Sequence, residues 1–282
     1  MRYAEIRREI AAGTAARTVP RWARRVLDDI AAGRVVMEAV RHPLGFLCLP
    51  VERSGDLGVC LHIWSPEVES AAVTTSGVHC HSWELVSFVL YGEVRNTRAF
   101  VADAPASGAG GATHRVFEVV SKGEVDELRA TGRTVRYATG DTGTHGTGAV
   151  YTLPAGEFHS THVEDGAEAA TVALGRQDPD GADLSLGPLV APSHRMRRLR
   201  CDPDQTARAA RRSARRIEAA RAVPAEPDPP AAPPGLVPGG VPDAAPGGGP
   251  GGGLGGSRAG VRGGGLDGGP GARRRSGPAA RG

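Results

Sequence analysis

The stretch that decides the fold is VHCHSWELVSFVLYGEV, residues 78–94. It is rich in β-branched and aromatic side chains, which favour extended strands. It carries two histidines, His79 and His81, with one residue between them. Successive side chains of a strand point to opposite faces, so both imidazoles project into the same space. Neutral imidazoles at this spacing can chelate a divalent metal ion. An isolated pair of this kind is more often two solvated or hydrogen-bonded core histidines than a metal site.

A second stretch, GAVYTLPAGEFHSTHV at residues 148–163, strengthens the metal interpretation. Its spacing is G-x5-P-x-G-x2-H, running from Gly148 to His159. A strand enters, Pro154 and Gly156 form a tight turn, and the chain returns with His159 directed inward. This stretch therefore adds a third candidate imidazole.

Together the two stretches resemble the paired motifs of the cupin superfamily, and the resemblance covers roughly residues 43–175. The second motif departs only at its last position, where Val163 replaces the customary asparagine, and the first keeps the closing Gly92. The resemblance implies an all-β double-stranded β-helix barrel with a metal at its mouth. The fold class we expect is that barrel with N-terminal helices and a disordered C-terminal tail. The implied metal ligands are His79, His81 and His159.

One departure from the cupin pattern concerns the carboxylate ligand. Leu85 occupies the position of the usual glutamate, and strand alternation turns the adjacent Glu84 to the face opposite the two histidines. We therefore expect three histidine ligands without a carboxylate. Three neutral ligands leave a divalent ion with its full charge, so that it can bind an anionic chelating substrate such as a thiolate and still offer a position to dioxygen.

A tri-histidine cupin of this kind resembles the thiol dioxygenases, which implies Fe(II), O₂ and a small thiol. The cysteine–tyrosine crosslink of the animal enzymes is impossible here, because its cysteine would stand at Leu85. The strand GFLCLPV also lacks the arginine that anchors a substrate carboxylate, and Arg53 is only nearby. Free cysteine is therefore not the expected substrate. Two alternatives stay open: a non-redox zinc or manganese enzyme (isomerase, lyase or bond-forming), and a metal-stabilised binding module.

Several further residues are candidates for the site. We assign catalytic roles to Tyr151 and His62, and Trp83 and Phe158 are candidates for the pocket wall, although aromatic residues in barrels are often plain core. At most one of Arg95 and Arg98 is expected to face inward and bind a substrate acid. The remaining expectations are that Cys80 faces away from the metal and that His162, His114 and His145 are exposed to solvent.

The chain divides by periodicity. Residues 1–42 read as helical, with Thr18 as N-cap, Pro20 in the first turn and an apolar face that we expect to pack on a sheet. Short strands fill the barrel at 43–176. An extension at 177–221 contains a segment, 203–221, so polar that its helix is either exposed or not stably formed. Residues 222–282 are almost entirely Gly, Pro, Ala and Arg and are expected to be disordered.

Composition limits the partners. The net charge of +3 divides into +5 for residues 201–282 and −2 for the rest, which disfavours a nucleic-acid-binding domain. The four cysteines form no C-x-x-C pair, as in reduced cytoplasmic proteins. No run is apolar enough for a signal peptide or a membrane span. The expected partners are a small-molecule substrate and O₂, with no membrane and no specific nucleic acid. A homodimer through edge strands is also an expectation, since cupin barrels often pair in that way.

Overall fold

The computed structural model describes residues 1–67, 71–108, 110–178 and 181–222. Helices α1 (Tyr3–Ala11) and α2 (Ala15–Ala31) precede the strands, and α3 (Pro203–Ala222) follows them. The strands are β1 (Val40–Arg41), β2 (Leu47–Ser54), β3 (Leu57–Trp64), β4 (His79–Cys80), β5 (Leu85–Tyr91), β6 (Glu93–Asp103), β7 (His114–Lys122), β8 (Val125–Gly146), β9 (Val150–Leu153), β10 (His159–His162), β11 (Ala169–Arg176), β12 (Asp183–Pro188), β13 (His194–Arg197) and β14 (Leu199–Arg200). The tail expected from residue 222 lies outside the described residues from 223 onward.

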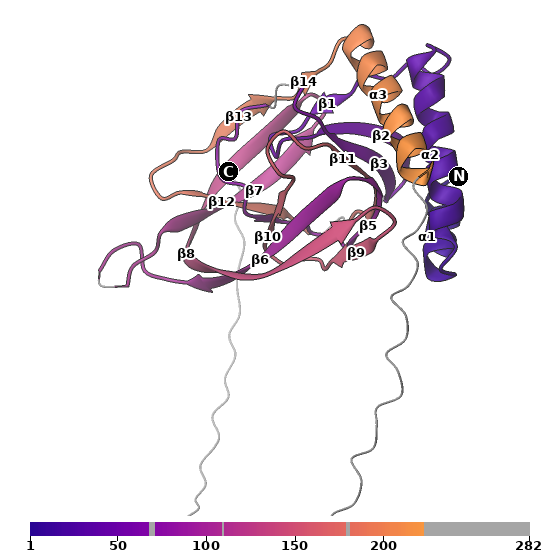
Figure 1. The fold of residues 1–282 in the computed structure, drawn as a ribbon. Coiled ribbons are helices and arrows are strands. Elements are labelled where there is room, and N and C mark those ends of the chain that lie inside the picture. Colours follow the sequence, from indigo (N-terminus) through magenta and orange to yellow (C-terminus); the bar gives the residue numbers. More distant parts are fainter. Residues whose placement is uncertain (68–70, 109, 179–180, 223–282) are drawn as a thin grey trace, which may run out of the picture. The chain divides into compact units, whose positions relative to one another are not determined.

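The strands form two antiparallel sheets (Figure 1). The first has the order β14-β1-β2-β3-β11-β5-β9, and the second has the order β13-β8-β6-β10-β4-β12-β7. The long strand β8 also pairs with β7, so the second sheet closes on itself. The all-β prediction is confirmed, and the two facing sheets are consistent with a cupin-like barrel.

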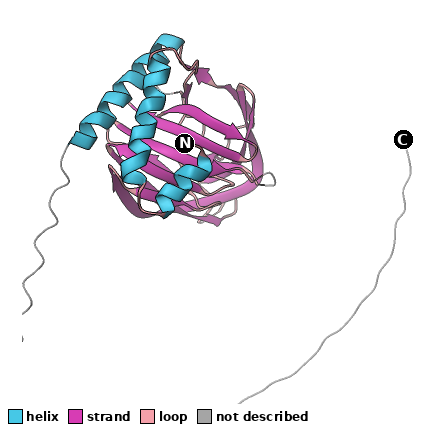
Figure 2. Cartoon of the chain, turned by 90° about the vertical axis from the view of Figure 1, so that its right-hand side faces the viewer, coloured by secondary structure: helices cyan, strands magenta, loops and turns pink. Residues whose placement is uncertain are grey.

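The helices cover the outer face of the first sheet (Figure 2). Trp22 and Leu27 of α2 belong to the same buried cluster as Leu49 and Leu61 of that sheet, so burial of apolar surface holds the layers together. The expectation that this helical face packs on a sheet is confirmed. The alternate residues of the strands point the other way, and Cys60 among them belongs to the cluster inside the barrel.

The start of α2 differs from the prediction. The N-cap position belongs to Thr14, and Thr18 lies inside the helix, where its hydroxyl donates to the Thr14 carbonyl and the Glu9 carboxylate. Pro20 is also inside the helix. The prediction was wrong because Ala15 and the residues after it are good helix formers, which extend the helix toward its N-terminus.

The polar segment near residue 210 forms a packed helix, contrary to the expectation for it. One face of α3 is buried against α2 and the first sheet through Ala210, Ala214 and Ile217. Alanines contribute little to a hydrophobic pattern in the sequence. Their small size nevertheless allows two helices to approach closely. Among the described helices, none is long and apolar enough to cross a membrane.

Gly92 joins two strands, β5 and β6, that do not pair with each other. β5 belongs to the first sheet and β6 to the second, so the chain crosses between the sheets at Gly92. Gly92 has a φ of +78°, and a Cβ there would lie 2.1 Å from the carbonyl oxygen of Glu168. Only glycine can occupy position 92, where the chain crosses between the sheets, because a side chain would meet the backbone of Glu168.

Candidate metal centre

The three predicted histidines lie together on two neighbouring antiparallel strands, β4 and β10, and directly after β4. His79 on β4 is the direct cross-strand partner of His159 on β10. His81 follows β4, and its ring centroid is 4.9 Å from that of His79 and 5.4 Å from that of His159. One ring nitrogen from each residue lies within 4.8 Å of the others. We call these three residues the histidine triad.

The Pro154–Gly156 turn places the third histidine. The Gly156 N–H donates to the carbonyl oxygen of His81 at 2.8 Å, so the turn is tied to the strand that carries the first two histidines. Gly156 has a φ of +74°, the left-handed conformation that glycine adopts without strain. The spacing of the second motif therefore sets the distance between His159 and His81.

Hydrogen bonds fix the orientation of two of the rings. Nδ1 of His79 lies 3.0 Å from the carbonyl oxygen of Gly77, and Nδ1 of His159 lies 2.9 Å from the carbonyl oxygen of Glu157. A carbonyl only accepts, so each Nδ1 carries the proton and each Nε2 keeps a lone pair. Metal-bound histidines are oriented by hydrogen bonds of this kind.

The Nε2 atom of His159 shows that these residues fit a metal ion. It is buried, and no hydrogen-bond partner lies near it among the described residues. A buried nitrogen without a partner costs on the order of 1–3 kcal/mol. A cation bound by the triad would use this lone pair.

The triad is held in the neutral form that binds metals. Burial lowers the pKa of His79 to about 3, and the neighbouring His159 adds to the effect. Burial also lowers the pKa of His81, well below its ordinary value, and that of His159. All three imidazoles are therefore uncharged at neutral pH, with one ring nitrogen free to bind a metal.

No carboxylate joins the histidine group in the described part of the chain. Leu85 is buried in the interior cluster, whereas Glu84 lies outside and pairs with Arg7 of α1 at 3.6 Å. Trp83 stacks on His81 with ring centroids 4.5 Å apart. The tryptophan ring fills the space over Gly175, where a Cβ would lie 2.5 Å from it.

The opposite wall of the barrel carries the two candidates for catalysis, His62 and Tyr151. His62 pairs with Thr171 across β3 and β11, and its ring lies 4.3 Å from that of Phe46. Tyr151 pairs with Ser87 across β9 and β5. Burial raises the pKa of the Tyr151 hydroxyl, which keeps the phenol neutral.

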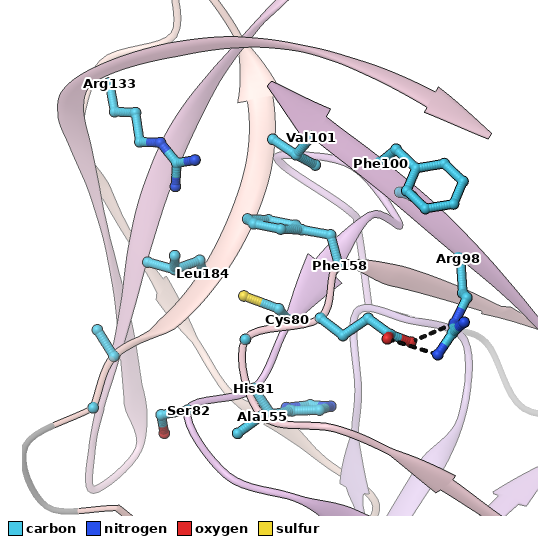
Figure 3. A pocket seen from close by; sticks show the side chains of 15 residues that line it. Cys80, His81, Ser82, Arg98, Phe100, Val101, Arg133, Ala155, Phe158 and Leu184 are labelled. Carbon is cyan, nitrogen blue, oxygen red and sulfur yellow. Dashed lines mark hydrogen bonds and ion pairs between the residues drawn. The ribbon is translucent and has the colours of Figure 1, made fainter. Parts of the chain in front are cut away.

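The remaining candidates have other surroundings. Arg95 pairs with Glu93, and Arg98 makes a two-pronged pair with Glu157, with both contacts at 2.8 Å. The Cys80 side chain lies on the face of β4 opposite His79, as expected, and lines a hollow of about 630 Å³ together with Phe158, Leu184 and, at its edge, His81 of the triad (Figure 3). His162 is exposed as expected. His145 is not simply solvated, because its ring stacks on Tyr151 at 4.7 Å.

The sequence analysis missed His42 and the grouping of two cysteines. The His42 ring stacks on Phe46 at 4.3 Å, and burial, with His62 and His79 nearby, lowers its pKa to about 3. Cys48 and Cys60 lie beside His62. Alternation along adjacent strands was the available signal, since these two cysteines and His62 have the inward-facing parity of β2 and β3.

Comparisons with known proteins add little to this geometry. No protein-family model matches the sequence, and no curated protein matches it. Among solved structures, a hydroquinone 1,2-dioxygenase, PnpCD, in complex with Cd²⁺ and 4-hydroxybenzonitrile overlaps with 46% of this chain at 14% identity and a TM-score of 0.28. The overlap spans 63% of the neighbour, less than two thirds of its length.

Proposed function

We propose that this chain is a metal-dependent cupin enzyme that holds one divalent ion through His79, His81 and His159. We further propose that the ion is Fe(II) and that the enzyme is a non-haem dioxygenase of a small thiol or a related chelating metabolite. The observation that carries the proposal is the neutral histidine triad, in which His159 is buried and His79 and His81 are half-buried, with no carboxylate beside it among the described residues.

The triad and the residues around it each have a role in this proposal. The triad would orient the ion through backbone-fixed imidazoles, and bound Fe(II) would supply the exchange of electrons with O₂. Trp83, stacked on His81, and Leu85 would exclude water from one side. Tyr151 and His62, on the facing wall, are the residues that we propose contact the substrate. The neutral Tyr151 hydroxyl can both donate and accept a hydrogen bond there.

The absence of a ligand carboxylate favours an anionic, chelating substrate. An ion held by three neutral imidazoles keeps a double positive charge, which a thiolate partly neutralises. Arg53, which the sequence places only near the expected substrate site, donates from its guanidinium to Cys60 Sγ at 3.1 Å.

A non-redox zinc or manganese enzyme is the second candidate, and the same triad supports it. Three histidines and one open position are a common catalytic zinc site. Such an enzyme would use the ion as a Lewis acid and would need no oxygen. A metal-stabilised binding module without turnover is the third candidate, from a different class.

Reconstitution separates the three candidates. Metal-free protein is loaded under anaerobic conditions with Fe(II) or with Zn(II), and oxygen consumption is then followed with cysteamine, 3-mercaptopropionate and cysteine. We expect oxygen uptake with the iron form and a thiol, and none with the zinc form.

Two variants provide the controls for that assay. His159→Ala removes a ligand and should abolish turnover, whereas His162→Ala changes an exposed histidine three residues further along and should not. Turnover by the zinc form, or turnover without oxygen, would exclude the dioxygenase and favour the non-redox enzyme. Metal binding with no turnover of any substrate would favour the binding module.

A further inference from the structure

A second group of ligand-type side chains lies on the wall of the barrel formed by β2 and β3. Sγ of Cys48, Sγ of Cys60 and a ring nitrogen of His62 all lie within 4.8 Å of one another. Cys48 is the direct cross-strand partner of His62, and Cys60 is two residues before His62 on the same face. We use the name thiol group for the set of four residues Cys48, Cys60, His62 and Arg53.

The two sulfur atoms are in direct contact. The Cys48 thiol donates to Cys60 Sγ at 3.2 Å. The β2–β3 ladder shifts its register between Pro50 and Glu52, beside Cys60, so the strand is already irregular there. A disulfide has an S–S distance of about 2.0 Å, so the two sulfurs would have to approach by about 1 Å more. Both cysteines are free thiols in this structure.

The surroundings make the two sulfurs unequal. Cys60 Sγ accepts hydrogen bonds from the Cys48 thiol and from Nη2 of Arg53, at 3.2 and 3.1 Å. The Cys48 contact, followed by His62 and Arg53, outweighs burial and holds the pKa of Cys60 well below its ordinary value. The same contact and burial raise the pKa of Cys48. Cys60 is therefore the more acidic of the two thiols and the one suited to react as the thiolate, with Cys48 as the thiol that resolves the product.

The positive charge of Arg53, rather than the spacing of the sulfurs, disfavours a second metal ion at this position. Two thiolates on one tetrahedral zinc ion, each about 2.3 Å from it, lie about 3.8 Å apart. The sulfurs of Cys48 and Cys60 are only slightly closer, at 3.2 Å. The guanidinium of Arg53, in contact with Cys60 Sγ, places a positive charge beside any cation that would bind there.

We propose that Cys48 and Cys60 form an oxidation site at which a peroxide converts the dithiol into an intramolecular disulfide. The Cys60 thiolate attacks one oxygen of hydrogen peroxide, the O–O bond breaks, and a sulfenic acid and hydroxide form. The Cys48 sulfur then attacks the Cys60 sulfur, the S–O bond breaks, and the thiol proton leaves with the hydroxide as water. Each sulfur loses one electron, and the two peroxide oxygens gain one each. This inference does not rest on the proposed dioxygenase activity.

Mass spectrometry of the full chain tests the proposal. Protein pretreated with a chelator, to exclude metal-catalysed oxidation, is exposed to hydrogen peroxide, denatured, alkylated and digested. We expect a Cys48–Cys60 disulfide, reversed by dithiothreitol, that forms at least about 10-fold faster than oxidation of Cys80 or Cys201. Those two thiols are internal controls, since burial raises the pKa of Cys80 to about 11 and also raises that of Cys201.

Variants assign the two sulfurs. Cys48→Ser should leave a Cys60 sulfenic acid that dimedone traps, whereas Cys60→Ser should leave Cys48 unmodified over the same time. Arg53→Gln, a change at an exposed side chain that should not disturb folding, should slow disulfide formation several-fold. The proposal would be overturned by oxidation of Cys80 or Cys201 at the rate of Cys60. It would also be overturned by a second bound metal ion per chain that is lost in Cys48→Ser. Neither readout depends on enzyme activity.

Discussion

The histidine triad and the thiol group are two constellations of three potential ligands in one barrel, and their surroundings separate them. Both bring three ligand atoms within 4.8 Å. In the triad, backbone carbonyls occupy Nδ1 of His79 and His159, and the buried Nε2 of His159 has no partner among the described residues. In the thiol group, Cys60 Sγ already accepts two hydrogen bonds. Proximity alone does not define a metal site, because the free lone pairs decide what can bind.

The largest expected effect is on metal binding by His159→Ala. Loss of this ligand should weaken metal affinity by more than about 100-fold, because removing even an outer hydrogen-bond partner of a ligand costs 10–100-fold. Elemental analysis after dialysis measures occupancy, and circular dichroism checks the fold. Cys48→Ser should keep full occupancy. Equal loss of metal in the two variants would erase the distinction between the groups.

Gly92→Ala tests the crossing that brings the two sheets, and hence the two groups, together. The added Cβ meets the Glu168 carbonyl oxygen at 2.1 Å. We expect a loss of about 3 kcal/mol or more in the free energy of unfolding, measured with urea, since backbone must move to relieve the clash.

Gly148→Ala is the matched control for that change. Gly148 also has a positive φ, of +85°, but nothing lies within 4 Å of the added Cβ. The expected loss is about 1 kcal/mol, from the backbone conformation alone. Similar losses in the two variants would show that the close approach at Gly92 is not what requires glycine.

Glu168→Gln tests the attachment of α3 to the sheet that carries the thiol group. Burial raises the pKa of the Glu168 carboxyl, but hydrogen bonds from Arg212 and Arg216 outweigh it and hold that pKa below its ordinary value. The carboxylate therefore stabilises the fold above the unfolded-state pKa of about 4.3, and the contribution disappears as the pH falls through the folded-state pKa. We expect a loss of about 2 kcal/mol at pH 7 that shrinks below pH ~4.

Urea unfolding as a function of pH measures this effect, and Glu67→Gln is its control. Glu67 also pairs with Arg212 but is 64% exposed, so its loss should cost less than about 1 kcal/mol. A difference between wild type and Glu168→Gln that is constant from pH 3 to pH 7 would contradict the assigned ionisation.

Glu84→Gln should change neither metal stoichiometry nor affinity. The carboxylate pairs with Arg7 on the outer surface, where its side chain is 54% exposed. Elemental analysis of the variant beside wild type measures this directly. Loss of metal would mean that Glu84 turns inward and that the centre is the four-ligand type with a carboxylate.

Truncation after Arg221 should have no effect on metal content, activity or melting temperature. The removed sequence has almost no aromatic or β-branched residues with which to dock on the barrel. A melting temperature several degrees lower would show that the tail contributes to stability.

The sequence predicted the triad from two local patterns and from the resemblance to the paired cupin motifs, which joins them. Alternation places His79 and His81 on one side, and the Pro154–Gly156 turn fixes His159 within a few residues. The outward position of Glu84 followed from the same alternation. The orientation of Trp83 on His81 could not be predicted, because it depends on the space over Gly175, a residue of a distant strand.

The thiol group and the packing of α3 depend on long-range contacts. Cys48 and Cys60 meet only through the register of β2 on β3, and that register includes a shift beside Pro50. The buried face of α3 is made mostly of small side chains, so the polar composition of the segment wrongly predicted an exposed or unstable helix. Both errors arise where tertiary packing, rather than local pattern, decides the outcome.

X-ray absorption spectroscopy of the metal-loaded protein tests the central claim most directly. The account predicts one ion per chain, with a first shell of nitrogen and oxygen only and with the multiple scattering of three imidazoles. Sulfur at about 2.3 Å from the metal would place the ion at Cys48 and Cys60 instead, and would contradict the assignment of the metal to the histidine triad.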